Sequence, residues 1–212
     1  MIPSFEAWLV VLALGLGLAV LSILGPARLL VDLDIPRPSW PWRSGLGLSV
    51  FCAVIVANLI VPPTALALSL ALSLTAGACV AIAIYDASFL IIPNVFSVAI
   101  AIAALLFWWA GLILPSVTGA GLCAGLLALV AWAWKKSRGG DGLGQGDIKL
   151  AGVLGLILGV QGGLWLIIGA ASSGALWGLT MMRLRLDAQP PLIPFGLFMS
   201  VCGLGLVLAQ AR

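Results

Sequence analysis

The chain has 212 residues, of which 63% are hydrophobic and only 8% are charged. A soluble domain needs about 25% charged residues to cover its surface, so this composition excludes an ordinary water-soluble protein. The net charge of +3 comes from short basic clusters between apolar runs, which indicates no nucleic-acid partner and predicts a lipid bilayer around most of the chain.

Apolar runs separated by polar breaks predict an all-α fold, a polytopic bundle of about eight transmembrane helices, or seven if one short run does not span. Residues 1–212 leave no room for a separate soluble domain, so we expect a single membrane domain. Pro62-Pro63, Pro115 and Gly162-Gly163 mark tight turns. The predicted helices cover approximately residues 5–25, 46–62, 65–85, 95–114, 117–134, 148–161, 163–182 and 194–210.

The basic residues are distributed as this helix assignment requires. In membrane proteins, Lys and Arg concentrate in the cytoplasmic connections. Nine of the ten basic residues fall in connections on one face of the predicted bundle, and only Arg212 falls on the other. This split predicts that both termini lie on the non-cytoplasmic side of the inner or plasma membrane. It also places the end of the third helix, with Asp86, and the start of the sixth, with Asp147, at the cytoplasmic face.

Histidine is absent, which removes the commonest metal ligand and general base. The four cysteines lie inside apolar runs without CxxC spacing, so we expect them to pack as small apolar groups and not to form a metal site or disulfides. Glycines four apart predict close helix packing at three pairs: Gly121 with Gly125, Gly155 with Gly159, and Gly174 with Gly178.

Two of the seven acidic residues differ from the rest. Asp86 and Asp147 each sit where an apolar helix meets the cytoplasmic face, and an ionisable group there is costly enough to indicate a role. A plain structural reading exists for both: Asp86 finishes a span, and Asp147 is the N-cap of the next helix. The other five, listed here, are read as solvated loop charges: Glu6, Asp32, Asp34, Asp141 and Asp187.

Considered as a pair, the two aspartates predict chemistry. Two carboxyl groups that face one another cannot both ionise easily, so they share a proton near neutral pH. One then activates a water molecule as general base while the other polarises a scissile carbonyl. This mechanism needs no histidine, metal or cofactor, and we expect none.

Three short motifs resemble the type IV prepilin peptidase family, also called leader peptidases. Asp86 is followed by Pro93-Asn94, and Gly144-x-Gly146-Asp147-x-Lys149 comes later in the chain. Pro194-Phe195-Gly196 is similar to the third recurring element of the family.

The resemblance implies an intramembrane aspartyl endopeptidase with Asp86 and Asp147 as catalytic residues. Its partner is a pilin-like precursor, from which it cleaves a short basic leader at the cytoplasmic face. Gly144 and Gly146 are expected to allow close packing near the cleaved backbone. Lys149 is expected to orient the site or to meet lipid headgroups.

One feature departs from the large members of the family. Those members carry a long cytoplasmic insertion with two CxxC pairs after the first span, and they methylate the new N-terminus. Residues 26–45 form a short segment without cysteine, so we expect peptidase activity without methyltransferase activity.

Two alternatives of other kinds stay open. A small transporter could use the two aspartates as a proton or cation relay, although such sites usually lie near the bilayer midplane. A structural membrane subunit would leave the glycine–aspartate pattern unexplained. Presenilin-like or signal-peptide-peptidase-like proteolysis shares the Tyr-Asp and Gly-x-Gly-Asp motifs, but Pro93-Asn94 and Lys149 favour the prepilin family.

Overall fold

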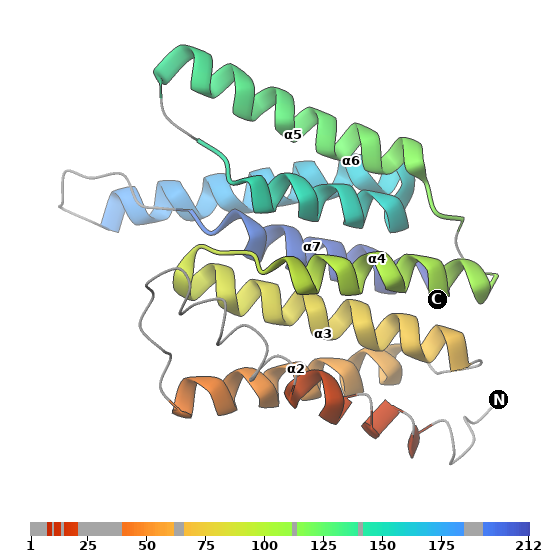
Figure 1. Cartoon of the computed structure of the whole chain (residues 1–212). Coiled ribbons are helices and arrows are strands. Elements are labelled where there is room, and N and C mark those ends of the chain that lie inside the picture. Colours follow the sequence, from red (N-terminus) through yellow and green to blue (C-terminus); the bar gives the residue numbers. More distant parts are fainter. Residues whose placement is uncertain are drawn as a thin grey trace.

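A computed structural model describes residues 8–9, 11–13, 15–20, 40–61, 66–111, 114–139, 142–184 and 193–212. All regular elements in these segments are α-helices, as the sequence predicts. Figure 1 shows the labelled helices as a bundle whose members run roughly along one direction. They are α2 (Trp40–Ile60), α3 (Leu66–Phe89), α4 (Asn94–Trp109), α5 (Val117–Arg138), α6 (Gln145–Leu184) and α7 (Phe195–Gln210).

Hydropathy located the helices but not their full lengths. α2 begins six residues before the predicted start at residue 46, and α5 continues to Arg138 instead of ending at 134. The apolar run marks only the part of a helix that suits hydrocarbon, and the backbone hydrogen bonds continue into the polar ends. The predicted helix 5–25 is only partly covered, with an apolar helix at Val11–Val20 that runs over undescribed positions.

Within the described segments, four helices are long and apolar enough to cross a membrane. They are α2, α3, α5 and α6, while α4 and α7 are apolar but shorter. These findings agree with a polytopic membrane protein. The predicted number of spans and the side on which each terminus lies stay predictions.

α6 contains a sharp break that the sequence analysis placed three residues too late. Gly159 has φ 71° and ψ −172°, so the helix is interrupted there and not at Gly162-Gly163. An ideal Cβ placed on Gly203 of α7 would lie near both Leu154 and Leu166, so the two parts of α6 lie side by side. Figure 1 shows the chain reversing direction at this point. The prediction of two helices in this region is therefore confirmed, and only the position of the break differs.

α3 lies at the centre of the bundle. It packs on α2, α4 and α7, while α6 packs on α4, α5 and α7. In the apolar part of α3, 67% of residues are buried, against 17% for α5, which therefore offers most of its surface to the surroundings. Of the cysteines, Cys79 and Cys123 are buried as predicted, but Cys52 is exposed.

The site is positioned by how these helices end and begin. α3 ends at the same end of the bundle at which α4, α6 and α7 begin (Figure 1). Asp86 is the fourth residue from the end of α3, and Asp147 is the third residue of α6. Helices far apart in the sequence therefore bring the two carboxyl groups to one end of the molecule.

Candidate active site

Asp86 is held at the N-terminus of α7. Its side chain is 5% exposed, and its Oδ2 accepts a hydrogen bond of 2.9 Å from the backbone N–H of Leu197. The first N–H groups of a helix have no partner inside the helix and carry the positive end of its dipole. Asp86 therefore does more than finish a span: its carboxyl group joins α3 to α7, and the helix end stabilises negative charge on it.

Asp147 occupies the equivalent place on α6. Its Oδ2 accepts a hydrogen bond of 3.1 Å from the backbone N–H of Gly144. Because α6 begins at Gln145, Gly144 is the N-cap and Asp147 is the third residue of the helix. The sequence-based interpretation of Asp147 as the N-cap itself is thus wrong by three positions. The side chain reaches back to the cap residue, as an acidic residue does in a capping box.

The other oxygen of Asp147 is the least satisfied polar atom of the site. Oδ1 is buried and has no hydrogen-bond partner within the described part of the chain. The two carboxyl groups are close enough to interact electrostatically. A buried carboxylate oxygen without a partner is unusual, and such atoms commonly have a functional explanation.

Glycines allow the close approach around both carboxyl groups. An ideal Cβ on Gly144 would lie 3.0 Å from Asp147 Oδ2, and one on Gly196 would lie 3.0 Å from Asp86 Oδ2. An ideal Cβ on Gly146 would lie 3.0 Å from the Cβ of Ile92. All three predicted glycines therefore lie at the site, and each is adjacent to a group that a side chain would displace.

Ile92 is a site residue that the sequence analysis missed. An ideal Cβ on Gly196 would lie 2.6 Å from Ile92 Cδ1, so this one side chain contacts the glycines beside both Asp86 and Asp147. It lies in the connection between α3 and α4, which begins at Leu90, the one described non-glycine residue with positive φ, at 55°. No signal in the sequence identifies it, because it stands in a run of apolar residues.

Lys149 and Asn94 link the first two motifs. The Nζ of Lys149 donates a hydrogen bond of 3.3 Å to Asn94 Oδ1 across 55 positions of sequence. Pro93 is buried and occupies the N-cap position of α4, and Pro194 occupies the N-cap position of α7. Lys149 therefore connects α6 to the start of α4, and its role at the site stays a prediction.

Phe195 lies against the second part of α6. Its ring packs near Gly174 in the second part of α6, where an ideal Cβ would lie 3.8 Å from Phe195 Cδ2. The described contacts of Phe195 thus anchor the start of α7. Phe195 positions the helix whose N–H group binds Asp86.

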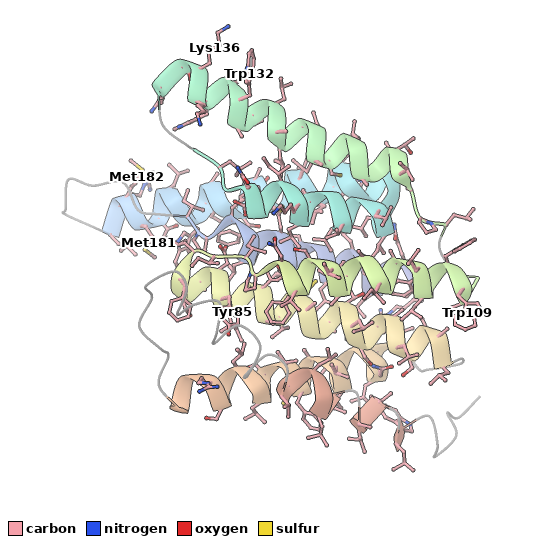
Figure 2. The ribbon with its side chains drawn as sticks, viewed as in Figure 1. Tyr85, Trp109, Trp132, Lys136, Met181 and Met182 are labelled. Atoms are coloured by element: carbon pink, nitrogen blue, oxygen red, sulfur yellow. The ribbon has the colours of Figure 1, made fainter. Side chains whose placement is uncertain are left out.

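An aromatic cluster fixes the end of α3. Tyr85 is 1% exposed, and its ring lies 6.1 Å from that of Phe89 and 5.9 Å from that of Phe96 on α4. Figure 2 shows the position of Tyr85 at this end of the bundle. Aromatic pairs at such separations add to the packing of the helices that carry them. The cluster sets the direction of the α3 residues next to it, including Asp86.

Comparison with known proteins gives one consistent result. The profile of the Type IV leader peptidase family matches residues 72–179, a stretch that contains both aspartates. A prepilin leader peptidase/N-methyltransferase of Dickeya chrysanthemi is 34% identical over 203 residues, covering 85% of this chain and 70% of that protein. The protein of the same name from Aeromonas salmonicida strain A449 is 29% identical over 191 residues.

The matches differ in extent. The Aeromonas alignment covers 80% of this chain but 64% of the relative, so the chain spans less than two thirds of that protein. A prepilin leader peptidase/N-methyltransferase of Burkholderia pseudomallei strain K96243 is 40% identical, but only over 86 residues. No solved structure matches the chain. From the profile match over half of its length and the Dickeya relative, the chain belongs to the type IV leader peptidase family.

Proposed function

We propose that this protein is an aspartyl peptidase that removes the basic leader from pilin-like precursors, with Asp86 and Asp147 as its catalytic pair. The observation that carries the proposal is the buried, unpartnered Oδ1 of Asp147, on a helix start that Ile92 links to the glycine in contact with Asp86. Membership of the leader peptidase family supports the same reaction. So do the names of the relatives, each called a prepilin leader peptidase/N-methyltransferase.

The pair can perform hydrolysis without further groups. The ionised carboxylate takes a proton from water, whose oxygen forms a bond to the scissile carbonyl carbon. The protonated carboxyl group gives its proton to the carbonyl oxygen. As the tetrahedral intermediate collapses, the C–N bond breaks and the leaving nitrogen receives the proton that the first carboxyl group had taken. One hydroxyl group of the intermediate returns a proton to the second carboxyl group, which restores the pair to its starting state.

The surroundings of the pair suit this reaction. Each carboxyl group has one oxygen on a backbone N–H at a helix N-terminus, which fixes its orientation and stabilises the single negative charge that the pair carries. The Lys149–Asn94 hydrogen bond holds α6 against α4. Both carboxyl groups lie near helix ends and not at mid-span, which speaks against the relay of a transporter.

We further propose that cleavage takes place at the cytoplasmic membrane face and that the product is not methylated. The first part is supported by the basic residues at the end of the bundle that carries the site. The second is supported by the absence of a CxxC pair anywhere in the chain. Mass spectrometry of the processed precursor should then give an N-terminus without an added methyl group.

A cleavage assay in proteoliposomes tests the proposal. A pilin-like precursor is incubated with the wild type, Asp86→Asn or Asp147→Asn, and shortening is followed over time. We expect each substitution to reduce the rate by at least about a hundredfold, since each removes a proton-transfer group. Asp141→Asn, the same change at the aspartate three positions before Gly144 in the sequence, serves as the matched control and should cleave normally.

The outcome separates the possibilities clearly. If Asp86→Asn or Asp147→Asn inserts, keeps the unfolding temperature of the wild type and still cleaves at the normal rate, the paired-carboxyl mechanism is wrong. If the wild type cleaves none of a panel of precursors with basic leaders, the peptidase function itself is refuted.

A further inference from the structure

A pocket lies on the seam between α3 and α7. Its volume is about 270 Å³. Val201 is 62% exposed and Gly205 is exposed, so the pocket opens to the outside of the bundle. Its wall includes residues of both helices: Cys79, Ala83, Ser200, Leu204, Gly205 and Leu208.

The pocket lies on the same two helices that bring Asp86 against Gly196. Ala83 precedes Asp86 by three residues on α3, and Ser200 follows Gly196 by four residues on α7. Residues three or four apart lie on the same face of a helix. The contact between Asp86 and Gly196 therefore lies about one helical turn from the pocket along both helices.

Ser200 gives the pocket a specific polar feature. Its side chain is 1% exposed, and its Oγ has no hydrogen-bond partner in the segments that the structure describes. The remainder of the wall consists of apolar side chains, glycine and one thiol. An occupant that brings an acceptor would satisfy this hydroxyl group. A polypeptide offers backbone carbonyl groups, whereas the acyl chain of a lipid offers no acceptor.

The small residues of the wall also favour a polypeptide. Ala83 of α3 and Gly205 of α7 both line the pocket. An ideal Cβ on Gly205 meets no atom within 4 Å, so the space beside its backbone is open. Small residues at a helix surface permit the backbone of another helix to approach closely in a membrane.

We propose that this α3–α7 pocket binds the apolar segment of the precursor that follows the cleaved bond. This inference rests on the proposed peptidase function. With the scissile bond between Asp86 and Asp147, the segment enters the seam beside Gly196 and continues past Leu208. That distance corresponds to twelve residues of α7, about 18 Å at 1.5 Å per residue. The Oγ of Ser200 donates a hydrogen bond to a backbone carbonyl of the bound segment.

The test compares two substrates in proteoliposomes. One is a full precursor, and the other is a peptide that contains the leader and the cleavage site but lacks the apolar segment. Gly205→Leu fills the pocket, and the open space at Gly205 lets it do so without displacing other atoms. Gly121→Leu is the matched control, because Gly121 is also a helical glycine with no atom within 4 Å of an ideal Cβ, but it lies on α5.

We expect Gly205→Leu to slow cleavage of the full precursor by about tenfold, as overpacking of a contact does. Cleavage of the short peptide should stay within about twofold of the wild type, as for a surface change. Gly121→Leu should leave both rates within the same range. Ser200→Ala should raise the KM of the full precursor by about fivefold with kcat unchanged, for the loss of one hydrogen bond.

Other results would overturn the inference. If Gly205→Leu cleaves the full precursor at the wild-type rate, or slows both substrates equally, the pocket does not bind the apolar segment. A second test replaces Leu208 with the photoreactive residue benzoylphenylalanine in the Asp147→Asn variant. On illumination it should form an adduct with the precursor. Adducts with lipid alone would also refute the inference. If the wild type cleaves neither substrate, the proposed function itself fails, which is a different result.

Discussion

The glycines around the two carboxyl groups are required by space and not by backbone conformation. Neither Gly144 nor Gly196 is among the described glycines with positive φ. Instead, a Cβ at Gly144 would press on the carboxyl group of Asp147, and one at Gly196 would press on Asp86 and Ile92. Each glycine thus sets where a carboxyl oxygen can lie.

Gly196→Ala tests this requirement at the tightest of these contacts. The added methyl group would lie 2.6 Å from Ile92 Cδ1 and 3.0 Å from Asp86 Oδ2, so one of them must move. A displacement of about 1 Å at a catalytic group can lower the rate about a hundredfold, and we expect a loss of that order in kcat with little change in KM. Initial rates over a range of precursor concentrations separate the two constants.

Gly125→Ala provides the comparison for Gly196→Ala. Gly125 lies in α5, and an ideal Cβ there meets no atom within 4 Å. The kcat of Gly125→Ala should equal that of the wild type. A wild-type kcat for Gly196→Ala would show that the site tolerates the methyl group and that the glycine does not position Asp86.

The residues with distinctive chemistry could be predicted from the sequence, and those that act through shape could not. Asp86, Asp147 and their glycines stand out, since few charges interrupt the apolar runs. Ile92 has no such contrast with its neighbours, and only the folded chain shows that it contacts glycines of both α6 and α7. The bond between Lys149 and Asn94 likewise depends on how α6 meets α4.

At the scale of helices, α5 and α6 come closest through Gly119, which the spacing of glycines did not indicate. An ideal Cβ on Gly119 would lie 2.5 Å from the backbone oxygen of Gly155 and 2.6 Å from the backbone carbon of Gly159. The prediction that Gly155 and Gly159 permit close packing is therefore confirmed. The prediction for Gly121 and Gly125 is wrong, because both face open space.

Spacing alone cannot show which face of a helix meets its neighbour, and the same limit applies to the break in α6. Three glycines lie within five residues there, at 159, 162 and 163. Gly159 adopts the left-handed conformation, while Gly163 packs against the sulfur of Cys123 and Gly162 against Leu158. A glycine can adopt the left-handed conformation that breaks a helix, and it can also permit close packing. The sequence therefore identified the region of the turn but not the residue at which the helix breaks.

Gly119→Ala should destabilise the protein, whereas Gly121→Ala should not. The methyl group at position 119 would meet backbone atoms, which cannot rotate away, so α5 and α6 must separate. Overpacking of this kind costs about 1–3 kcal/mol. At position 121, which is open, alanine should be neutral or stabilising by up to about 1 kcal/mol through its better helix propensity. Thermal unfolding in detergent measures both, and equal unfolding temperatures would contradict the proposed contact.

At the scale of the whole molecule, positive charge gathers at the end that carries the site. α2 starts there with Arg43, α5 ends there, and α6 both begins and ends there (Figure 1). Of the described basic residues, only Arg212 lies at the end of α7, away from the site. The others are Arg43, Lys135, Lys136, Arg138, Lys149 and Arg183.

The end of α5 has the features of a membrane–water interface. Lys136 lies 5.1 Å from the ring centre of Trp132, and Arg138 lies 4.7 Å from that of Trp134. Figure 2 shows Trp132 and Lys136 projecting away from the other helices. Tryptophan concentrates at the headgroup level, and basic residues there favour the cytoplasmic side. The carboxyl groups share this end of the bundle, so the site lies at the same end as these tryptophan and basic side chains.

This arrangement predicts the orientation of the protein in the membrane. A basic leader is cytoplasmic before cleavage, so the proposed reaction requires the Asp86–Asp147 end to face the cytoplasm. We expect Ser137→Cys, at the end of α5, to react with a membrane-impermeant maleimide only after cells are permeabilised. Leu114→Cys, which is 78% exposed at the other end of the bundle, should react in intact cells.

The wild type supplies the background of labelling, because its own four cysteines are present in each variant. Labelling of both variants in intact cells would show that these positions do not lie on opposite sides of a membrane barrier. The reverse pattern would place the carboxyl groups on the outer face, where they could not meet a leader before export. In that case the transporter alternative, which needs no particular side for its carboxyl groups, would account for Asp86 and Asp147 better than peptide cleavage does.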